Sequence, residues 1–238
     1  MERRQLKKGL IVLGVLFMSS VHAVQNVPPG YYTRLSGGVN VMPGFQPTEI
    51  YALNGQPNYY DGTVKYSFEP GAQGDIAFGY RFPNLLRAEV AWGTIKDNMT
   101  GRYTFTNGAQ NGNTLNTGYV QATTYMLNAY YDFPAPSKTT PYVGAGVGYV
   151  QRTYYYQTQA NAATGNSFKW DINNVGVQVI AGLGWDVAPR TTLLLDYRFL
   201  FSPTQEVQFS DALGTQTGTG SYTYLNNLFS IGLMYVFA

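Results

Sequence analysis

From Pro29 onward the chain alternates between apolar and polar residues with a period of two, in stretches of about ten residues. In the last stretch, large apolar side chains at odd positions from Phe229 to Phe237 alternate with Ser230, Gly232 and Met234. A period of two is the side-chain repeat of a β-strand, and no helical periodicity of useful length interrupts it. We expect eight strands, at about residues 31–42, 72–82, 86–95, 119–133, 142–152, 175–187, 191–201 and 222–237.

Alternation alone also fits a soluble sandwich with one wet face. Here, however, the charged residues of the strands lie opposite the large aliphatic and aromatic residues, and the strands contain almost no Lys. Charged residues make up only 12% of the chain, about half the usual share. This distribution favours a polar face enclosed as a lumen and an apolar face turned to lipid. Each strand can cross a bilayer at a tilt, and only a closed sheet leaves no unpaired edge there. The sequence therefore predicts an all-β fold, an eight-stranded antiparallel up-and-down transmembrane β-barrel.

The connections between the expected strands alternate in length. Segments 43–71, 96–118, 153–174 and 202–221 are long and polar, whereas 83–85, 134–140 and 188–190 are short. In bacterial barrels the short turns face the periplasm and the long loops face outward. The long segments are rich in Tyr, Asn, Thr, Gln and Gly, as in 107–116, a composition typical of recognition surfaces. For the run from Tyr154 to Tyr156, a recognition surface and an aromatic girdle beside a solvated loop are equally well supported.

The N-terminus has the three parts of a secretory signal peptide. Four basic residues precede an apolar run from Leu10 to Met18, and small residues lead to a cleavage site at Ala23. The apolar run is too short to span a bilayer comfortably. We expect residues 1–23 to be the signal peptide and residues 24–238 the outer-membrane β-barrel domain. N-terminal sequencing of the outer-membrane protein should begin at Val24, and a protein that begins at Met1 would contradict this prediction.

Removal of that segment changes the charge balance of the chain. Lys plus Arg falls from 15 to 11 and Asp plus Glu from 13 to 12, so the net charge becomes about −1. This leaves no basic excess for binding nucleic acid. The chain has no Cys, and its single histidine is His22, within the expected signal peptide. Small outer-membrane enzymes rely on a His as general base or as the partner of a Ser or Asp. We therefore expect neither an enzyme nor a metal site, and no cofactor.

Nine charged residues share the inner face of the expected strands. Eight strands leave an interior just wide enough for side chains to fill it, so charges there must pair. We expect the four arginines to pair with Asp75, Glu89, Asp132 and Asp196 in a plug that closes the lumen, the alternative being a conducting pore. The nine residues are Arg34, Asp75, Arg81, Arg87, Glu89, Asp132, Asp186, Asp196 and Arg198.

Three segments carry a resemblance to a known family. They are the Gly-rich stretch Thr140–Tyr149 after a short turn, Leu193–Arg198, and the closing strand with its alternating aromatics. In these features the chain resembles the eight-stranded outer-membrane barrels typified by the OmpA transmembrane domain and the Opa-type surface proteins. The resemblance implies an assembly signal at Tyr235 and Phe237, although the chain ends on Ala238 and not on an aromatic residue.

The resemblance also implies a location and partners. The location is the outer membrane of a Gram-negative bacterium, in contact with lipid and lipopolysaccharide, after insertion by the barrel assembly machinery. The implied function is that of a non-catalytic surface protein with a closed polar lumen and four long extracellular loops. Those loops would serve adhesion, recognition of an extracellular ligand or host surface, or envelope integrity. The alternative is a narrow porin-like channel or transporter for ions or small solutes.

Overall fold

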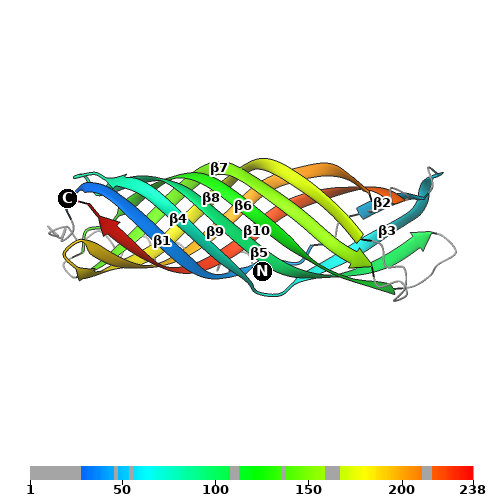
Figure 1. Ribbon diagram of the computed structural model, residues 1–238, viewed down its shortest axis with the longest axis horizontal. Coiled ribbons are helices and arrows are strands. Elements are labelled where there is room, and N and C mark those ends of the chain that lie inside the picture. The colour runs from blue at the N-terminus through cyan, green and yellow to red at the C-terminus, as the bar shows by residue number, and fades with distance from the viewer. Residues whose placement is uncertain are drawn as a thin grey trace, which may run out of the picture.

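The computed structural model describes residues 28–45, 48–53, 56–107, 113–135, 138–158, 167–210 and 216–237. Its regular elements are ten antiparallel strands (Figure 1). No helix long and apolar enough to cross a membrane occurs among the described residues. The strands are β1 (Gly30–Val41), β2 (Thr48–Leu53), β3 (Gln56–Phe68), β4 (Gly71–Arg81), β5 (Leu86–Asn107), β6 (Asn113–Asp132), β7 (Thr139–Thr158), β8 (Ser167–Ala188), β9 (Thr191–Ser210) and β10 (Gln216–Val236).

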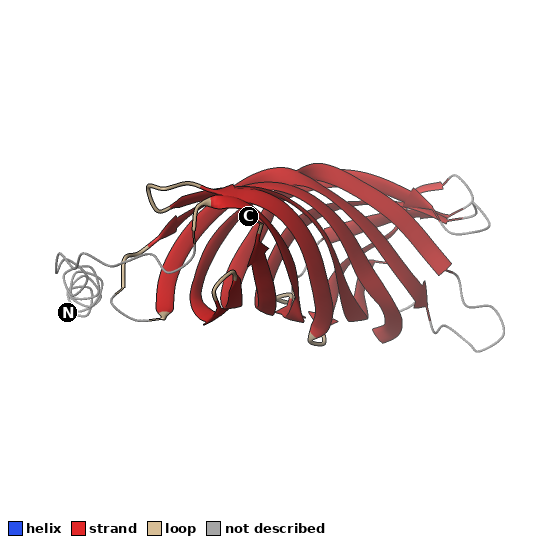
Figure 2. Cartoon of the chain, turned by 60° about the vertical axis from the view of Figure 1, so that its left-hand side comes forward, coloured by secondary structure: helices blue, strands red, loops and turns tan. Residues whose placement is uncertain are grey.

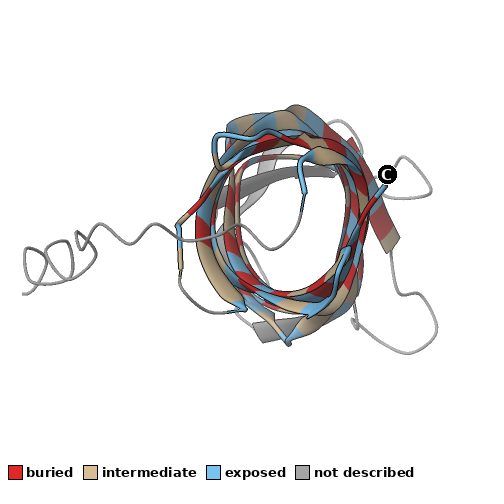
Figure 3. Ribbon diagram, turned by 90° about the vertical axis from the view of Figure 1, so that its left-hand side faces the viewer, coloured by how far each residue is buried: buried red, intermediate tan, exposed pale blue. Residues whose placement is uncertain are grey.

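Eight of these strands, β1 and β4 to β10, form a closed ring. β1 pairs with β4, and each strand from β4 to β9 pairs with the next one. β1 closes the ring by pairing with β10, with Tyr32 opposite Val236. Viewed along the barrel axis, the strands form a closed ring (Figure 3). The eight strands predicted from the alternation are these eight, so the β-barrel fold is confirmed. The C-terminus lies at the end where the short turns join the strands, which we call the turn end.

The expected long connection at residues 43–71 was predicted wrongly as a polar loop, because it contains the hairpin of β2 and β3. Where β1 and β4 end, β2 pairs with β10 and β3 pairs with β5. The hairpin thus replaces β1 and β4 in the ring, so that eight strands also surround the far half of the molecule. It covers the edges of β5 and β10, which would otherwise present unpaired backbone groups.

The other three long connections were also predicted too long. β5 ends at Asn107 where the alternation suggested Ile95, and β6 to β10 are likewise extended, to 20–22 residues each. Residues 108–112, 159–166 and 211–215 between these strand ends lie outside the described part of the chain. A tilted membrane strand needs about 9–11 residues. About half of each long strand, roughly 30 Å of strand at 3.3 Å per residue, therefore continues beyond the bilayer. Figures 1 and 2 show these long strands along the length of the barrel.

The two halves of the barrel have opposite side-chain polarity. Near the turn end, outward residues such as Val147 are apolar and exposed, as a lipid-facing band requires. Farther along the same strand, the outward residues Gln151 and Thr153 are polar, and the inward Tyr154 is buried. The far half has the pattern of a barrel in water, with an apolar interior and a polar exterior. We call the outward apolar residues of the first half the membrane band, and the second half the extension.

Candidate functional site

The lumen within the membrane band is filled by a network of ion pairs. The Arg34 guanidinium lies 2.8 Å from Glu89 Oε1 and 2.7 Å from Asp75 Oδ1. Arg198 bridges two acids, at 2.8 Å from Asp75 Oδ2 and 2.7 Å from Asp196 Oδ1. All five side chains are at most 7% exposed. The structure therefore links five of the nine predicted lumen residues across strands β1, β4, β5 and β9.

A second group of pairs lies closer to the turn end. Asp132 Oδ1 is 2.9 Å from Arg87 Nε, and Asp132 Oδ2 is 3.2 Å from Arg81 Nη2. The Arg87 guanidinium also lies over the rings of Tyr130 and Tyr142, at 4.6 and 4.8 Å from their centroids. The ninth predicted residue, Asp186, is only half-buried, and its carboxylate accepts a hydrogen bond from Thr192 at 2.8 Å.

Glu89 is the centre of the network. Besides Arg34, its carboxylate accepts hydrogen bonds from Tyr130 Oη at 2.7 Å, Asn128 Nδ2 at 3.0 Å and Tyr32 Oη at 3.0 Å. We did not single out these three neutral partners from the sequence. The available signal was the two-residue repeat, which places all three on the inner face together with Glu89. A carboxylate that accepts this many hydrogen bonds is held in a fixed position.

Small inward residues of β7 make room for these bulky polar side chains. A Cβ atom added to Gly144 would lie 2.5 Å from Tyr130 Cδ1, and one added to Gly146 would overlap Asn128 Oδ1. The Gly-rich stretch noted in the sequence therefore fits around Tyr130 and Asn128, because residues with a side chain would collide with them.

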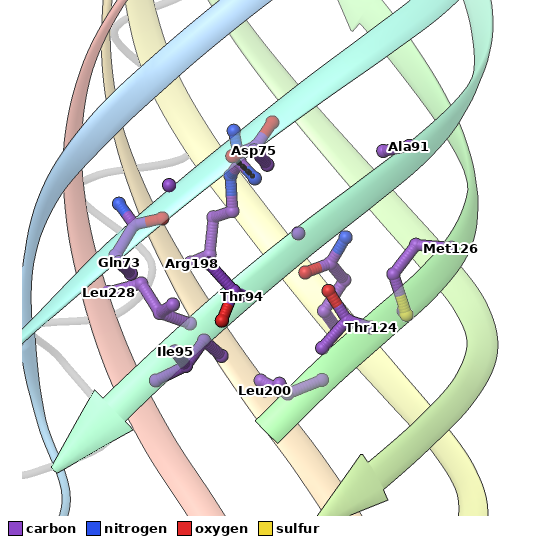
Figure 4. Close-up of a pocket in the computed structure, with 13 residues that line it drawn as sticks. Gln73, Asp75, Ala91, Thr94, Ile95, Thr124, Met126, Arg198, Leu200 and Leu228 are labelled. Carbon is purple, nitrogen blue, oxygen red and sulfur yellow. Dashed lines mark hydrogen bonds and ion pairs between the residues drawn. The ribbon is translucent and has the colours of Figure 1, made fainter. Parts of the chain in front are cut away.

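A small cavity separates the charged network from the extension (Figure 4). Asp75 and Arg198 lie on one side of it, and Ile95, Leu200 and Leu228 line the other side. Its volume is about 20 Å³, which is room for roughly one water molecule.

Aromatic side chains fill the lumen of the extension. The rings of Tyr154 and Trp170 stack at 5.3 Å with an angle of 4° between their planes, and Trp170 stacks on Phe209 at 4.9 Å. Tyr156 stacks on Phe168 in the same way. Neither interpretation of the Tyr154–Tyr156 run was right for Tyr154 and Tyr156, because both are buried inside the barrel. We call this group the aromatic core.

Two charged residues in the extension were not recognised from the sequence. Asp97 is fully buried and accepts hydrogen bonds from the side-chain amides of Asn40 and Asn226. Arg152 is 1% exposed, lies 5.3 Å from the centroid of the Tyr224 ring, and has no hydrogen-bond partner for its guanidinium within the described part of the chain. Asp97 fell in an expected loop, and Arg152 at the last residue of an expected strand, so neither was assigned to the lumen.

Burial raises the pKa of Asp97 to about 6, although the Asn226 and Asn40 amides act in the opposite direction. In the unfolded chain an Asp has a pKa of about 3.9, so between pH 4 and 6 the folded protein binds more protons than the unfolded one. The contribution of the protonated Asp97 carboxyl to the free energy of unfolding is present in full below pH 4. It is lost as the pH rises through 6. Wild type should therefore lose roughly 1–3 kcal/mol of stability between pH 4 and 7 relative to Asp97→Asn.

Thermal unfolding of both proteins across this pH range measures the difference. Asp171→Asn is a matched control, because Asp171 is exposed on the outer face of β8. Parallel pH profiles for wild type and Asp97→Asn would contradict the prediction.

The two residues of the expected assembly signal lie at the turn end. Tyr235 and Phe237 point outward, with ring centroids 5.5 Å apart, and the Phe237 amide donates to the Tyr31 carbonyl at 2.8 Å. Their role in assembly stays a prediction, and Ala23 lies outside the described residues. Within those residues, no group of three or more His, Cys, Asp or Glu could hold a metal ion.

These features define a class: a small closed β-barrel of the outer membrane with side chains packed through its lumen. Residues 78–219, more than half of the chain, match the model of the Opacity family porin protein, and the chain belongs to this family. It resides in the Gram-negative outer membrane.

Curated relatives agree with this assignment. The chain is 28% identical over 158 residues to an uncharacterized protein of Brucella abortus, covering 60% of this chain and 54% of that one. It is 31% identical over 96 residues to the opacity protein V28 of Neisseria gonorrhoeae, covering 31% of this chain and 40% of that protein. The chain spans about half the length of the first of these relatives.

Solved structures show the same fold. The outer membrane protein OprG from Pseudomonas aeruginosa superposes with a TM-score of 0.56 at 14% identity, covering 89% of this chain and 99% of that one. The outer membrane protease OmpT from Escherichia coli gives a TM-score of 0.54 at 10% identity, covering 92% and 99%. At these identities the likeness concerns the fold alone.

Proposed function

We propose that this chain is a non-catalytic surface protein that acts through its outer end, in adhesion or recognition, and that its lumen is closed. The observation that carries the proposal is the filling of the lumen along both halves. Ion pairs fill the membrane half and stacked aromatic rings fill the extension. A solute passing through would have to separate buried ion pairs, each of which costs several kcal/mol to break.

The extension supports an outward role. It carries the rim of the barrel roughly 25 Å beyond the membrane band, because strands tilted by about 40° rise less than their own length, and its outer face is polar. A rigid β-structured column can present its end to an extracellular ligand or host surface at little cost in conformational entropy. The match of the chain to the Opacity family model and its similarity to opacity proteins support the same proposal.

The sequence offers little for catalysis, since its one His is His22 and it has no Cys. Contact with lipid and lipopolysaccharide, and insertion by the barrel assembly machinery, are part of the same proposal.

Two measurements test this function. Planar bilayers containing the purified barrel should show no steady conductance, and bacteria that display it should bind host cells or matrix better than bacteria with an empty vector. A display strain in which residues 108–112 are deleted should lose binding and still insert. Steady current without any gain in binding would overturn the proposal in favour of a narrow channel.

A further inference from the structure

We propose that the outer face of β6, β7 and β8 binds the phosphorylated saccharide headgroup of a glycolipid in the outer leaflet. The site is a groove with a volume of about 420 Å³ on the outside of the barrel, just beyond the membrane band. It lies apart from the lumen and from the rim, and the inference rests on the contact with lipopolysaccharide that is part of the proposed function.

The floor of the groove is a grid of side chains that form hydrogen bonds. Strand register places them in two rows across β6, β7 and β8. The two rows are two residues apart along each strand, and the second lies farther from the membrane band. The first row is Thr123, Gln151 and Asn173, and the second is Gln121, Thr153 and Asp171. Amide and hydroxyl side chains both donate and accept, which suits the hydroxyl groups of a sugar.

Aromatic rings border this grid on both sides along the barrel axis. Below it, Tyr125 and Tyr149 are paired in the register and exposed at the edge of the membrane band. Above it, Tyr119 and Tyr155 stack with their ring centroids 5.3 Å apart. The C–H faces of a sugar ring can pack against such rings while its hydroxyl groups reach polar partners. A polar floor between aromatic walls is therefore complementary to a saccharide.

The charges around the groove favour an anionic ligand. Lys169 lines it, and the Lys96 ammonium is held over the Tyr119 ring, 5.0 Å from its centroid. Among the described residues that line the groove, Asp171 is the one carboxylate, and it already accepts a hydrogen bond from Thr153 at 2.6 Å. Two exposed lysines against one carboxylate create a positive potential that attracts phosphate.

The height of the groove identifies the source of the ligand. Its lower border, Tyr125 and Tyr149, belongs to the aromatic girdle that marks the membrane–water interface in such barrels. A group bound in the groove therefore lies at the level of the lipid headgroups. A lipid anchored in the same leaflet is present there at high effective concentration, whereas a soluble glycan is not.

The test uses the folded barrel in phosphatidylethanolamine nanodiscs, titrated with lipopolysaccharide, dephosphorylated lipopolysaccharide, phosphatidylglycerol or lipid-free core oligosaccharide. Binding is read from the rise in the temperature of barrel unfolding. We expect lipopolysaccharide alone to produce a large rise. In Lys96→Gln/Lys169→Gln and in Gln121→Ala/Gln151→Ala, its affinity should fall roughly tenfold, equivalent to about 1.4 kcal/mol.

The matched control is Thr204→Ala/Thr223→Ala, an exposed pair on β9 and β10 whose hydroxyl groups contact each other. It should bind lipopolysaccharide as wild type does. An equal effect of phosphatidylglycerol would reduce the site to a general anionic patch and overturn the proposal. Equal binding of the free oligosaccharide would overturn the glycolipid assignment. Unchanged affinity in both groove variants would overturn the location of the site.

Discussion

Glu89→Ala should lower the free energy of unfolding by about 3–5 kcal/mol, because it leaves the buried Arg34 with one fewer counter-charge and several donors unpaired. Glu89 accepts hydrogen bonds from Arg34, Tyr32, Asn128 and Tyr130, and all of these side chains are buried. The temperature at which the barrel changes its mobility in SDS gels should fall accordingly. The current across planar bilayers should stay at the wild-type level, because the aromatic core still fills the lumen of the extension.

Two further variants make this experiment specific. Glu206→Ala removes an exposed acid of β9 and should leave both the transition temperature and the current unchanged. Glu89→Gln retains a hydrogen-bonding side chain but removes the charge. Its transition temperature should therefore lie between those of wild type and Glu89→Ala. If the transition temperature of Glu89→Ala matches that of Glu206→Ala, the ion-pair network does not stabilise the barrel, and a steady current in Glu89→Ala would show that the aromatic core does not close the lumen.

The sequence was sufficient to predict the membrane half of the barrel. A strict two-residue repeat fixes which side chains share a face, so charged residues far apart in the chain could be assigned to one lumen. Arg34 and Glu89 are 55 residues apart and were placed together by parity alone. The two-residue repeat also places the neutral partner Tyr130 on the inner face of its strand. Its hydroxyl group carries no charge, so nothing in the sequence assigned it to an ion-pair network.

The extension could not be predicted by the same reasoning. Its strands also have a period of two, but polar residues move to the outer face when the surroundings change from lipid to water. By the pattern of a membrane strand, residues such as Thr153, Lys169 and Asp171 resemble a loop, although they lie on the outer face of strands. The groove on the outer face of β6, β7 and β8 could not be predicted either, because its residues come together only through the register of these three strands.

Trp170→Ala should destabilise the extension by about 3–5 kcal/mol, the usual cost of removing a large buried aromatic side chain. Trp170 stacks on Tyr154 and Phe209 and contacts Tyr156 edge-on at 5.4 Å, so it lies at the centre of the aromatic core. Its indole N–H has no hydrogen-bond partner within the described residues, so the loss comes from packing alone. Trp170→Phe should therefore cost much less, because it keeps a ring and removes an unpaired donor.

Hydrogen exchange in detergent micelles separates the two halves of the barrel in these variants. In Trp170→Ala, amides near Tyr154 and Phe168 should lose protection, whereas amides near Glu89 in the membrane half should keep it, because the two clusters pack separately. Tyr155→Ala is the control, since Tyr155 lies on the outer face of the neighbouring strand β7 and stacks on Tyr119. Equal loss of protection in Tyr155→Ala and Trp170→Ala would show that the interior rings do not hold the extension together, and its stability would then have to come from the strand pairing alone.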